Sequence, residues 1–158
     1  MSYRSNERPS RFAVAGLPLA GIAFLVFTAA LSITWSYCKL VWLDEFLVLT
    51  TDSTPSFSQI VHIQKAYPIS LDPLAYHAVA HAAILAFGPN AFSIRLPSLV
   101  GFLVMQVCLF VFVRRIASER AAVFALAFPA LTDALYFSVE GRPYSMMLGL
   151  TGLAMINW

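Results

Sequence analysis

Two adjacent carboxylates, Asp44 and Glu45, are the first residues along the chain whose types suit acid–base chemistry. They follow Trp42-Leu43 and precede the apolar residues 46–49, so hydrophobic anchors on both sides would hold them at a membrane surface. A carboxylate at such a partly desolvated boundary has a raised pKa and accepts a proton more readily near neutral pH. Asp44 and Glu45 are therefore candidate catalytic residues, although two acids that simply end a hydrophobic segment give the same pattern.

A second candidate is the segment Glu140-Gly141-Arg142-Pro143-Tyr144, in which glycine and proline predict a tight turn that presents Arg142. An arginine near a membrane surface can hold a phosphate through two parallel hydrogen bonds. It can equally lie among lipid headgroups or pair with Glu140. Arg142, Glu140 and Tyr144 are the candidate substrate-binding residues of this turn.

The other polar candidates lie between residues 52 and 95. His77 and His81 are four residues apart and share one face of a helix. They would hold a metal ion only with a third ligand from Asp72 or Asp44, and interfacial histidines without metal are more common, so no metal site is predicted, although a divalent cation could assist the chemistry. Arg95 is most simply an anchor at the start of a helix. The candidate substrate-binding residues of this stretch are Lys65, Asp72, His77 and Arg95.

The elements that must position these residues are apolar. Of the 158 residues 59% are hydrophobic and 11% are charged, and the mean hydropathy is +0.75. An ordinary soluble domain has about 25% charged residues, so the composition excludes a soluble globular fold, and it excludes disorder as well. The net charge of +2 is too small and too scattered for a nucleic-acid-binding surface.

Four apolar segments are predicted to cross a membrane, which makes the chain an all-α polytopic helical membrane protein. They are residues 12–35, 96–113, 121–139 and 143–158. Asp133 lies within the third, where a buried polar contact to a neighbouring helix is preferred over a proton-relay role. The fourth segment opens at Pro143 and the sequence stops within it at Trp158, so residues 1–158 are interpreted as the N-terminal part of a larger membrane domain.

Arginines fix the predicted orientation. Those at positions 4, 8 and 11 precede the first span, and a further cluster fills the turn 114–120, so the positive-inside rule places both in the cytoplasm. Residues 73–87 reach only about 22 Å and are predicted to lie along the outer interface, with Leu74, Val79, Ala82 and Leu85 facing lipid. Residues 36–95 then form one outer loop, and every candidate site residue lies on the extracytoplasmic face of the plasma (inner) membrane.

Five short motifs follow one another in the order Trp42-Leu43-Asp44-Glu45, Asp72-Pro73-Leu74-Ala75-Tyr76, Arg95-Leu96-Pro97-Ser98-Leu99, Arg114-Arg115 and Glu140-Gly141-Arg142-Pro143-Tyr144. Together they resemble the N-terminal part of glycosyltransferases that use polyprenyl-phosphate-linked sugars. These are enzymes of the GT-C superfamily, in the family 39 branch of protein mannosyltransferases and aminoarabinose transferases. The resemblance covers nearly the whole chain.

The resemblance implies an enzyme that moves a sugar, with inversion, from a lipid-linked phosphosugar to a protein, lipid or glycan acceptor. Asp44 matches the acidic residue taken as the base or acceptor-orienting group, and Glu45 completes the acidic pair. Arg142 matches the arginine of the second outer loop, a partner for the donor phosphate. In the favoured hypothesis Arg95 or Lys65 lies near the same phosphate.

The sequence departs from the family pattern at two places. Asp72 stands where the family has the first of two prolines, so the resemblance gives Asp72 no role. The protein mannosyltransferase branch has an aspartate soon after the arginine of the second loop, whereas this chain has Met146-Met147, so the acceptor class is not carried over.

Two alternatives stay open from the sequence. The chain could be a non-catalytic membrane scaffold or assembly subunit, or an inactive fragment, whose outer loop binds a partner. A transporter or channel component is motivated by Asp133 within a span, but the acids and histidines gather on one face instead of lining a path.

Overall fold

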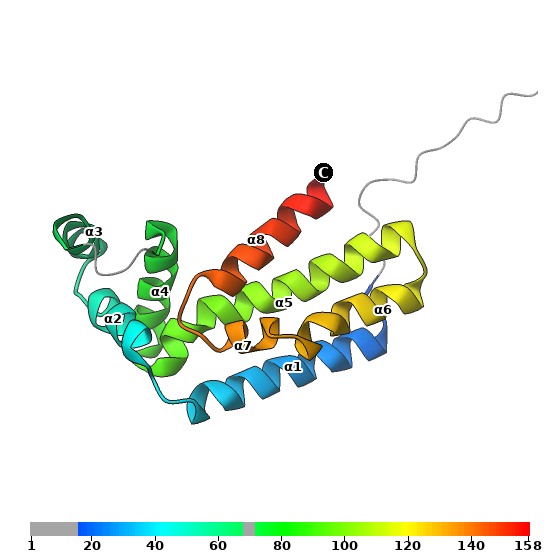
Figure 1. Cartoon of the computed structure of the whole chain (residues 1–158), viewed down its shortest axis with the longest axis horizontal. Helices are drawn as coiled ribbons and strands as arrows, with labels where there is room; N and C mark the ends of the chain where they lie inside the picture. The colour runs from blue at the N-terminus through cyan, green and yellow to red at the C-terminus, as the bar shows by residue number, and fades with distance from the viewer. Residues whose placement is uncertain (1–15, 68–71) are drawn as a thin grey trace, which may run out of the picture.

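A computed structural model describes residues 16–67 and 72–158, and this part of the chain is helical without β-strands. The all-α prediction is therefore confirmed for the described residues. In chain order the helices are α1 Leu19–Cys38, α2 Leu43–Asp52, α3 Phe57–Ala66, α4 Leu74–Phe87, α5 Ala91–Ile116, α6 Glu119–Ala127, the 3₁₀ helix η1 Phe128–Leu131, α7 Ala134–Ser138 and α8 Tyr144–Asn157 (Figure 1).

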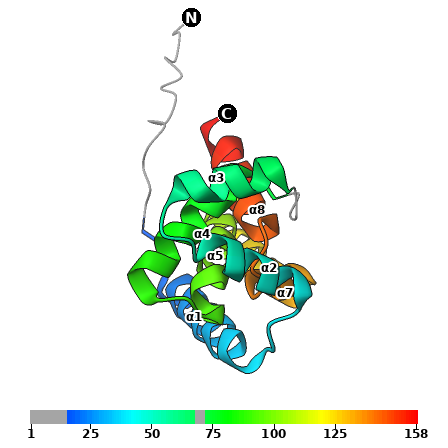
Figure 2. The same cartoon turned by 90° about the vertical axis from the view of Figure 1, so that its left-hand side faces the viewer.

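Helix α5 is the central element, because α1, α4, α6, α7 and α8 all pack against it (Figure 1). The short helices α2, α3 and α4 gather at one end of α5 and pack on one another; Figure 2 looks onto this end of the molecule. The turn between α5 and α6 lies at the opposite end (Figure 1).

Local sequence signals explain where α4 ends and α5 begins. Gly88 follows α4 with a φ of +81°, a left-handed conformation that suits glycine. Asn90 then caps α5, since its side chain accepts a hydrogen bond from the Ser93 amide at 3.0 Å. The turn between these two helices therefore follows from residues within it.

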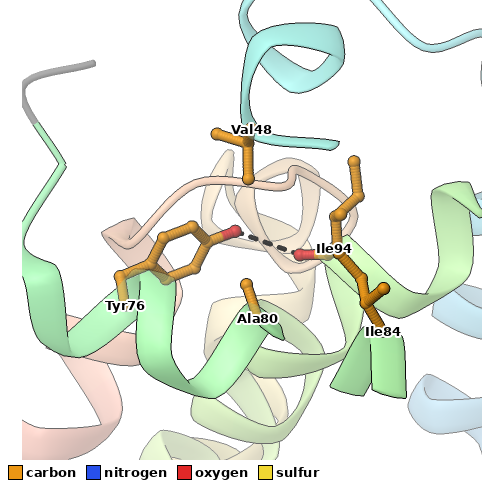
Figure 3. Close-up of a cluster of buried hydrophobic side chains, with 5 residues drawn as sticks. All are labelled: Val48, Tyr76, Ala80, Ile84 and Ile94. Atoms are coloured by element: carbon orange, nitrogen blue, oxygen red, sulfur yellow. Dashed lines mark hydrogen bonds between the residues drawn. The ribbon is translucent and has the colours of Figure 1, made fainter. Parts of the chain in front are cut away.

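A small apolar core joins α2, α4 and α5 at the end of α5 where the short helices gather. Its buried side chains are Val48, Tyr76, Ala80, Ile84 and Ile94 (Figure 3). The Tyr76 hydroxyl donates to the Ile94 carbonyl at 3.0 Å, so the one polar atom of this core is satisfied. This core fixes α4 against the start of α5.

Helices α5 and α8 approach so closely that only glycine fits at their crossing. A Cβ atom on Gly149 would lie 2.5 Å from the Gly101 carbonyl oxygen, and one on Gly101 would lie 2.4 Å from the Met146 Cα. Small residues at such positions let two backbones meet, which is the usual way that helices associate in a membrane. The crossing holds the start of α8, next to Arg142, against α5.

Two of the four predicted spans are continuous helices long and apolar enough to cross a membrane, namely α1 with a mean hydropathy of 1.8 and α5 with 2.4. Residues 12–15 of the first predicted span, and the arginines at positions 4, 8 and 11, lie outside the described residues. Helix α8 begins at Tyr144, as Pro143 predicts, but its 14 residues reach only about 21 Å.

The prediction of one continuous helix over 121–139 is wrong. The segment is divided into α6, η1 and α7, with Pro129 in the 3₁₀ turn and Asp133 before α7. Proline interrupts the helix because it lacks an amide proton and clashes with the preceding turn. The prediction that Asp133 makes a buried contact is also wrong, since its side chain is exposed.

The helix predicted over 73–87 is confirmed as α4, and the faces divide as expected. Leu74, Val79, Ala82 and Leu85 are exposed. The histidine face is buried against the neighbouring helices and does not face water, which the amphipathic interpretation did not foresee.

Different polar contacts hold the two ends of the bundle. At one end, the Arg114 guanidinium contacts the Gly16 carbonyl at 3.4 Å and Glu119 at 3.6 Å. At the other, the end of α1 meets Arg95 and the loop before α8. Residue 16 thus lies at the same end of the bundle as the turn after α5.

We expect Gly149→Ala to destabilise the protein by roughly 1–3 kcal/mol, because the added methyl group must push α8 away from the α5 backbone. Thermal unfolding in detergent, followed by tryptophan fluorescence, measures this. Ala154→Leu adds a larger group on an exposed position of the same helix and serves as the control, with little change expected. Equal stability of the two variants would contradict the close crossing.

Candidate functional site

The guanidinium of Arg95 is the most fully bonded charge in the described part of the chain. Arg95 lies inside α5 and is 0% exposed. Its Nη1 donates to the carbonyls of Ser36 at 2.6 Å and Lys39 at 3.0 Å, and its Nη2 donates to the carbonyl of Leu40 at 3.2 Å. Its Nε and Nη2 hold the two carboxylate oxygens of Glu45 at 2.8 and 2.6 Å. All five N–H donors of arginine are thus used.

These bonds explain how a charge can be buried here. The Ser36 carbonyl lies in the last turn of α1, where carbonyls have no partner within the helix and carry the negative end of its dipole, and Lys39 and Leu40 follow directly after the helix. Arg95 satisfies them while it binds Glu45 bidentately, so the positive charge is compensated on both sides. The interpretation of Arg95 as an interfacial anchor at the start of its helix is therefore wrong, because α5 already begins at Ala91 and the side chain is fully buried.

Glu45 extends this connection to the loop before α8. Its Oε1 accepts the Gly141 amide at 2.8 Å, and the side chain is 0% exposed. Burial by itself would raise the pKa of Glu45, but the hydrogen bonds from Arg95 and the Gly141 amide outweigh it, and the pKa lies below its ordinary value of 4.5. The expectation that both acids of the pair lie at the surface is therefore wrong for Glu45, whose carboxylate joins α2, α5 and the loop.

Asp44 points to a different place and belongs to an exposed charge cluster. Its Oδ2 accepts Nη2 of Arg142 at 3.1 Å, while Nη1 of Arg142 donates to Oδ2 of Asp72 at 2.8 Å. The side chains are 36% exposed for Asp44, 17% for Arg142 and 8% for Asp72. Three of the predicted site residues, separated by up to 98 positions in sequence, thus meet at one point.

The backbone of Arg142 is held from two sides. Ser98, on α5, donates its hydroxyl to the Arg142 carbonyl, and the preceding amide of Gly141 is bound by Glu45. Burial by itself would lower the pKa of Arg142, but the carboxylates of Asp72 and Asp44 outweigh it and raise this pKa, so the guanidinium is charged at every accessible pH. The Arg142 Nε is buried and has no hydrogen-bond partner among the described residues.

Two further candidates flank the cluster in different roles. Glu140 is 4% exposed and pairs with Lys39 at 3.4 Å, an ion pair that ties the loop to the end of α1. Lys39 also lies 4.4 Å from the centre of the Tyr136 ring. Tyr144 is 47% exposed at the start of α8, two residues beyond Arg142, with its ring packed on Phe137.

His77 belongs to a second, fully buried polar group between α2, α3 and α4. Its Nδ1 bonds Oδ1 of Asp52 at 2.8 Å and its Nε2 bonds the Gln64 amide at 2.8 Å, while Nδ1 of His81 bonds the Asp52 carbonyl at 2.8 Å. Burial raises the pKa of Asp52, and the hydrogen bond with His77 opposes this only in part. Both ring nitrogens of His77 are therefore engaged in holding helices together.

Lys65 lies exposed in the last turn of α3 and forms no ion pair with a described residue. Within residues 16–67 and 72–158, no group of three or more histidine, cysteine, aspartate or glutamate side chains is placed to hold a metal ion. The third ligand that His77 and His81 would need from Asp72 or Asp44 is therefore not supplied, and Asp72 and Asp44 bind Arg142 instead.

Sequence reasoning missed Ser98 and Lys39 as parts of this site. Ser98 lies three residues after Arg95 and so shares its helix face, which is a signal that periodicity could have supplied. The partner of Lys39 is 101 positions away, and only the packing of α1 beside the loop brings it close to Glu140.

No protein-family model, curated protein or solved structure matches the chain. The chemistry of the site must therefore be deduced from its own side chains.

We expect Glu45→Gln to destabilise the protein by about 3–5 kcal/mol, because it leaves the buried Arg95 charge without a carboxylate. Glu119→Gln is the matched control, since its pair with Arg114 is largely exposed and contributes under about 1 kcal/mol. Thermal unfolding of the detergent-solubilised protein at pH 7 compares the two variants. Similar losses for both would show that the buried pair does not hold the structure.

Glu45→Gln should also change how the stability of the protein depends on pH. The folded pKa of Glu45 is below the unfolded value near 4.5, so its carboxylate contributes full stability above pH 4.5, and this contribution is lost as the pH falls below it. The unfolding midpoint of the wild type should therefore fall more steeply below pH 4.5 than that of Glu45→Gln. Parallel curves would contradict the depressed pKa.

Proposed function

We propose that the protein is part of a membrane glycosyltransferase that takes a sugar from a lipid-phosphate-linked donor. In this proposal Asp44 is the base and Arg142 is the partner of the donor phosphate. The observation that carries this proposal is the contact between a partly exposed carboxylate and a partly exposed arginine, Asp44 and Arg142, at 3.1 Å. Inverting sugar transfer from a phosphate requires a base on one face of the sugar and a phosphate-binding group on the other, and this cluster supplies one group of each kind.

The proposed reaction uses these two side chains directly. Asp44 accepts the proton of an acceptor hydroxyl, and the oxygen attacks the anomeric carbon from the side opposite the phosphate. The bond between that carbon and the phosphate oxygen breaks, and its electron pair leaves on the phosphate, whose charge Arg142 stabilises. The configuration at the anomeric carbon inverts because attack and departure take place on opposite faces.

The surroundings support a lipid-linked substrate. Arg142 lies at the end of the bundle where α1 stops and α5 starts, and both helices are long and apolar enough to cross a membrane. One turn beyond it, Met146 lines an apolar groove of about 470 Å³ between α4, α5 and α8 that includes Pro97, Val100 and Leu153. A groove of this size and chemistry suits part of an isoprenoid chain.

Within this proposal the acidic pair divides its work. Asp44 touches the reacting groups, whereas Glu45 is a positioning residue that holds the loop of Arg142 beside α2 through the Gly141 amide. Arg95 acts through Glu45 in the same way. The orientation proposed for the site is extracytoplasmic in the plasma (inner) membrane, with the N-terminus in the cytoplasm.

One observation favours the second candidate, a non-catalytic membrane scaffold. Arg142 already holds two carboxylates, so its charge is compensated without any ligand. A scaffold of this kind should co-purify with a larger complex, and it should tolerate Asp44→Ala combined with Arg142→Ala.

We expect Asp44→Asn to abolish sugar transfer while the protein remains inserted in the membrane at wild-type levels, because the amide cannot accept the acceptor proton. Transfer of radiolabelled sugar from polyprenyl-phosphate donors in membranes that contain the protein measures this. Asp133→Asn, at an exposed aspartate away from the cluster, is the matched control and should keep activity. Wild-type turnover in Asp44→Asn would remove Asp44 from the mechanism and favour the scaffold.

A further inference from the structure

We infer that the donor phosphate takes the place of Asp44 on the Nε and Nη2 edge of Arg142, while Asp72 stays on Nη1 as the positioning residue that keeps the guanidinium in place. This inference rests on the proposed function, because it assumes that Arg142 binds a phosphate. It assigns different tasks to two carboxylates that hold the same arginine.

The first argument is the difference between the two ion pairs. Asp72 is bound at 2.8 Å and its side chain is 8% exposed, whereas Asp44 is bound at 3.1 Å and is 36% exposed. The more exposed pair is the weaker one, because water screens it and competes for its hydrogen bonds. An incoming anion therefore displaces Asp44 more easily than Asp72.

The second argument is the geometry of the guanidinium. Its Nε–H and one Nη2–H point from the same edge, and an oxyanion binds such an edge through two parallel hydrogen bonds. On Arg142 the Nη2 nitrogen holds a single oxygen of Asp44, and the Nε is buried without a partner among the described residues. A phosphate on this edge satisfies the Nε donor that the present arrangement leaves unused, whereas Asp72 on Nη1 does not block it.

The third argument is that everything around this edge is fixed. Ser98 holds the carbonyl of Arg142, and Glu45 holds the preceding amide. Glu45 also fixes the first turn of α2 through Arg95, next to Asp44. The exchange therefore takes place between side chains, while the backbone around Arg142 stays held.

The exchange has a chemical consequence for the proposed reaction. While Asp44 is paired with Arg142, its Oδ2 is held by the guanidinium. Binding of the phosphate releases Asp44 toward the acceptor, so the base becomes active only when the donor is present. Asp72 makes this exchange possible, because it keeps the guanidinium in place. It stands where the family that the sequence resembles has a proline, so the exchange is specific to this chain.

Two variants that remove the same charge separate the roles of the aspartates. We would measure the dissociation constant of farnesyl phosphate for the wild type, Asp44→Asn, Asp72→Asn and Arg142→Gln in phosphatidylcholine nanodiscs by isothermal titration. Removal of the competing carboxylate in Asp44→Asn should tighten binding about fivefold, the scale of one exposed ion pair. Asp72→Asn should tighten binding less than twofold or weaken it, because the guanidinium loses its anchor. Equal or greater tightening by Asp72→Asn overturns the inference.

The remaining arms separate this inference from the proposed function. Arg142→Gln should lose binding of farnesyl phosphate; if it binds as the wild type does, the proposed phosphate site itself fails. If binding of farnesyl phosphate needs Arg142 but Asp44→Asn does not tighten it, the proposed exchange fails while the phosphate site stands. The Asp44→Asn result therefore tests the exchange even if Asp72→Asn does not fold. Competition by inorganic phosphate at similar concentration would identify a free phosphate, and not a lipid phosphate, as the ligand of this edge.

Discussion

The structure depends on the buried contact between Arg95 and Glu45. A guanidinium without solvent must find an acceptor for each of its five donors, and Arg95 finds them in the Glu45 carboxylate and in the last carbonyls of α1. Because these acceptors lie in α1 and α2 while Arg95 lies in α5, the requirement fixes three helices at once. Glu45 also fixes the loop before α8, because it accepts a hydrogen bond from the Gly141 amide.

The exposed cluster is a consequence of this buried one. Asp44 is the neighbour of Glu45 in sequence, and Arg142 is the neighbour of Gly141, so the hydrogen bond between Glu45 and Gly141 brings the next residues of each segment side by side. Glu45 and Gly141 are buried and join the two segments, whereas Asp44 and Arg142 are partly exposed. The buried hydrogen bond between Glu45 and Gly141 therefore sets the positions of Asp44 and Arg142.

Two packing contacts on α5 support this arrangement. The apolar core around Tyr76 holds α4, and with it Asp72, against the start of α5. The glycine crossing of α5 and α8 holds the segment that follows Arg142 against the same helix. Both therefore use α5 as the common reference, which is why a cluster built from residues 44, 72 and 142 can be positioned by one long helix.

The sequence by itself determined the helical class, the two long apolar helices and the helix over 73–87 with its exposed apolar face, and it singled out Asp44 and Arg142 as candidate site residues. These follow from composition, periodicity and residue chemistry, which are local properties. Pro129 was visible in the sequence as well, but its interruption of the third predicted span was underestimated because the surrounding hydropathy is continuous.

Only the tertiary structure decided which charges are buried and which are paired. Glu45 and Asp44 are alike in sequence, yet one is fully buried and the other is 36% exposed, because the rotation of α2 is set by Arg95, 50 positions away. His77 proved to be a link between three helices, and Asp72 acquired a partner 70 positions away. Long-range electrostatic pairing depends on how helices are placed in space, and no local pattern in the sequence encodes that placement.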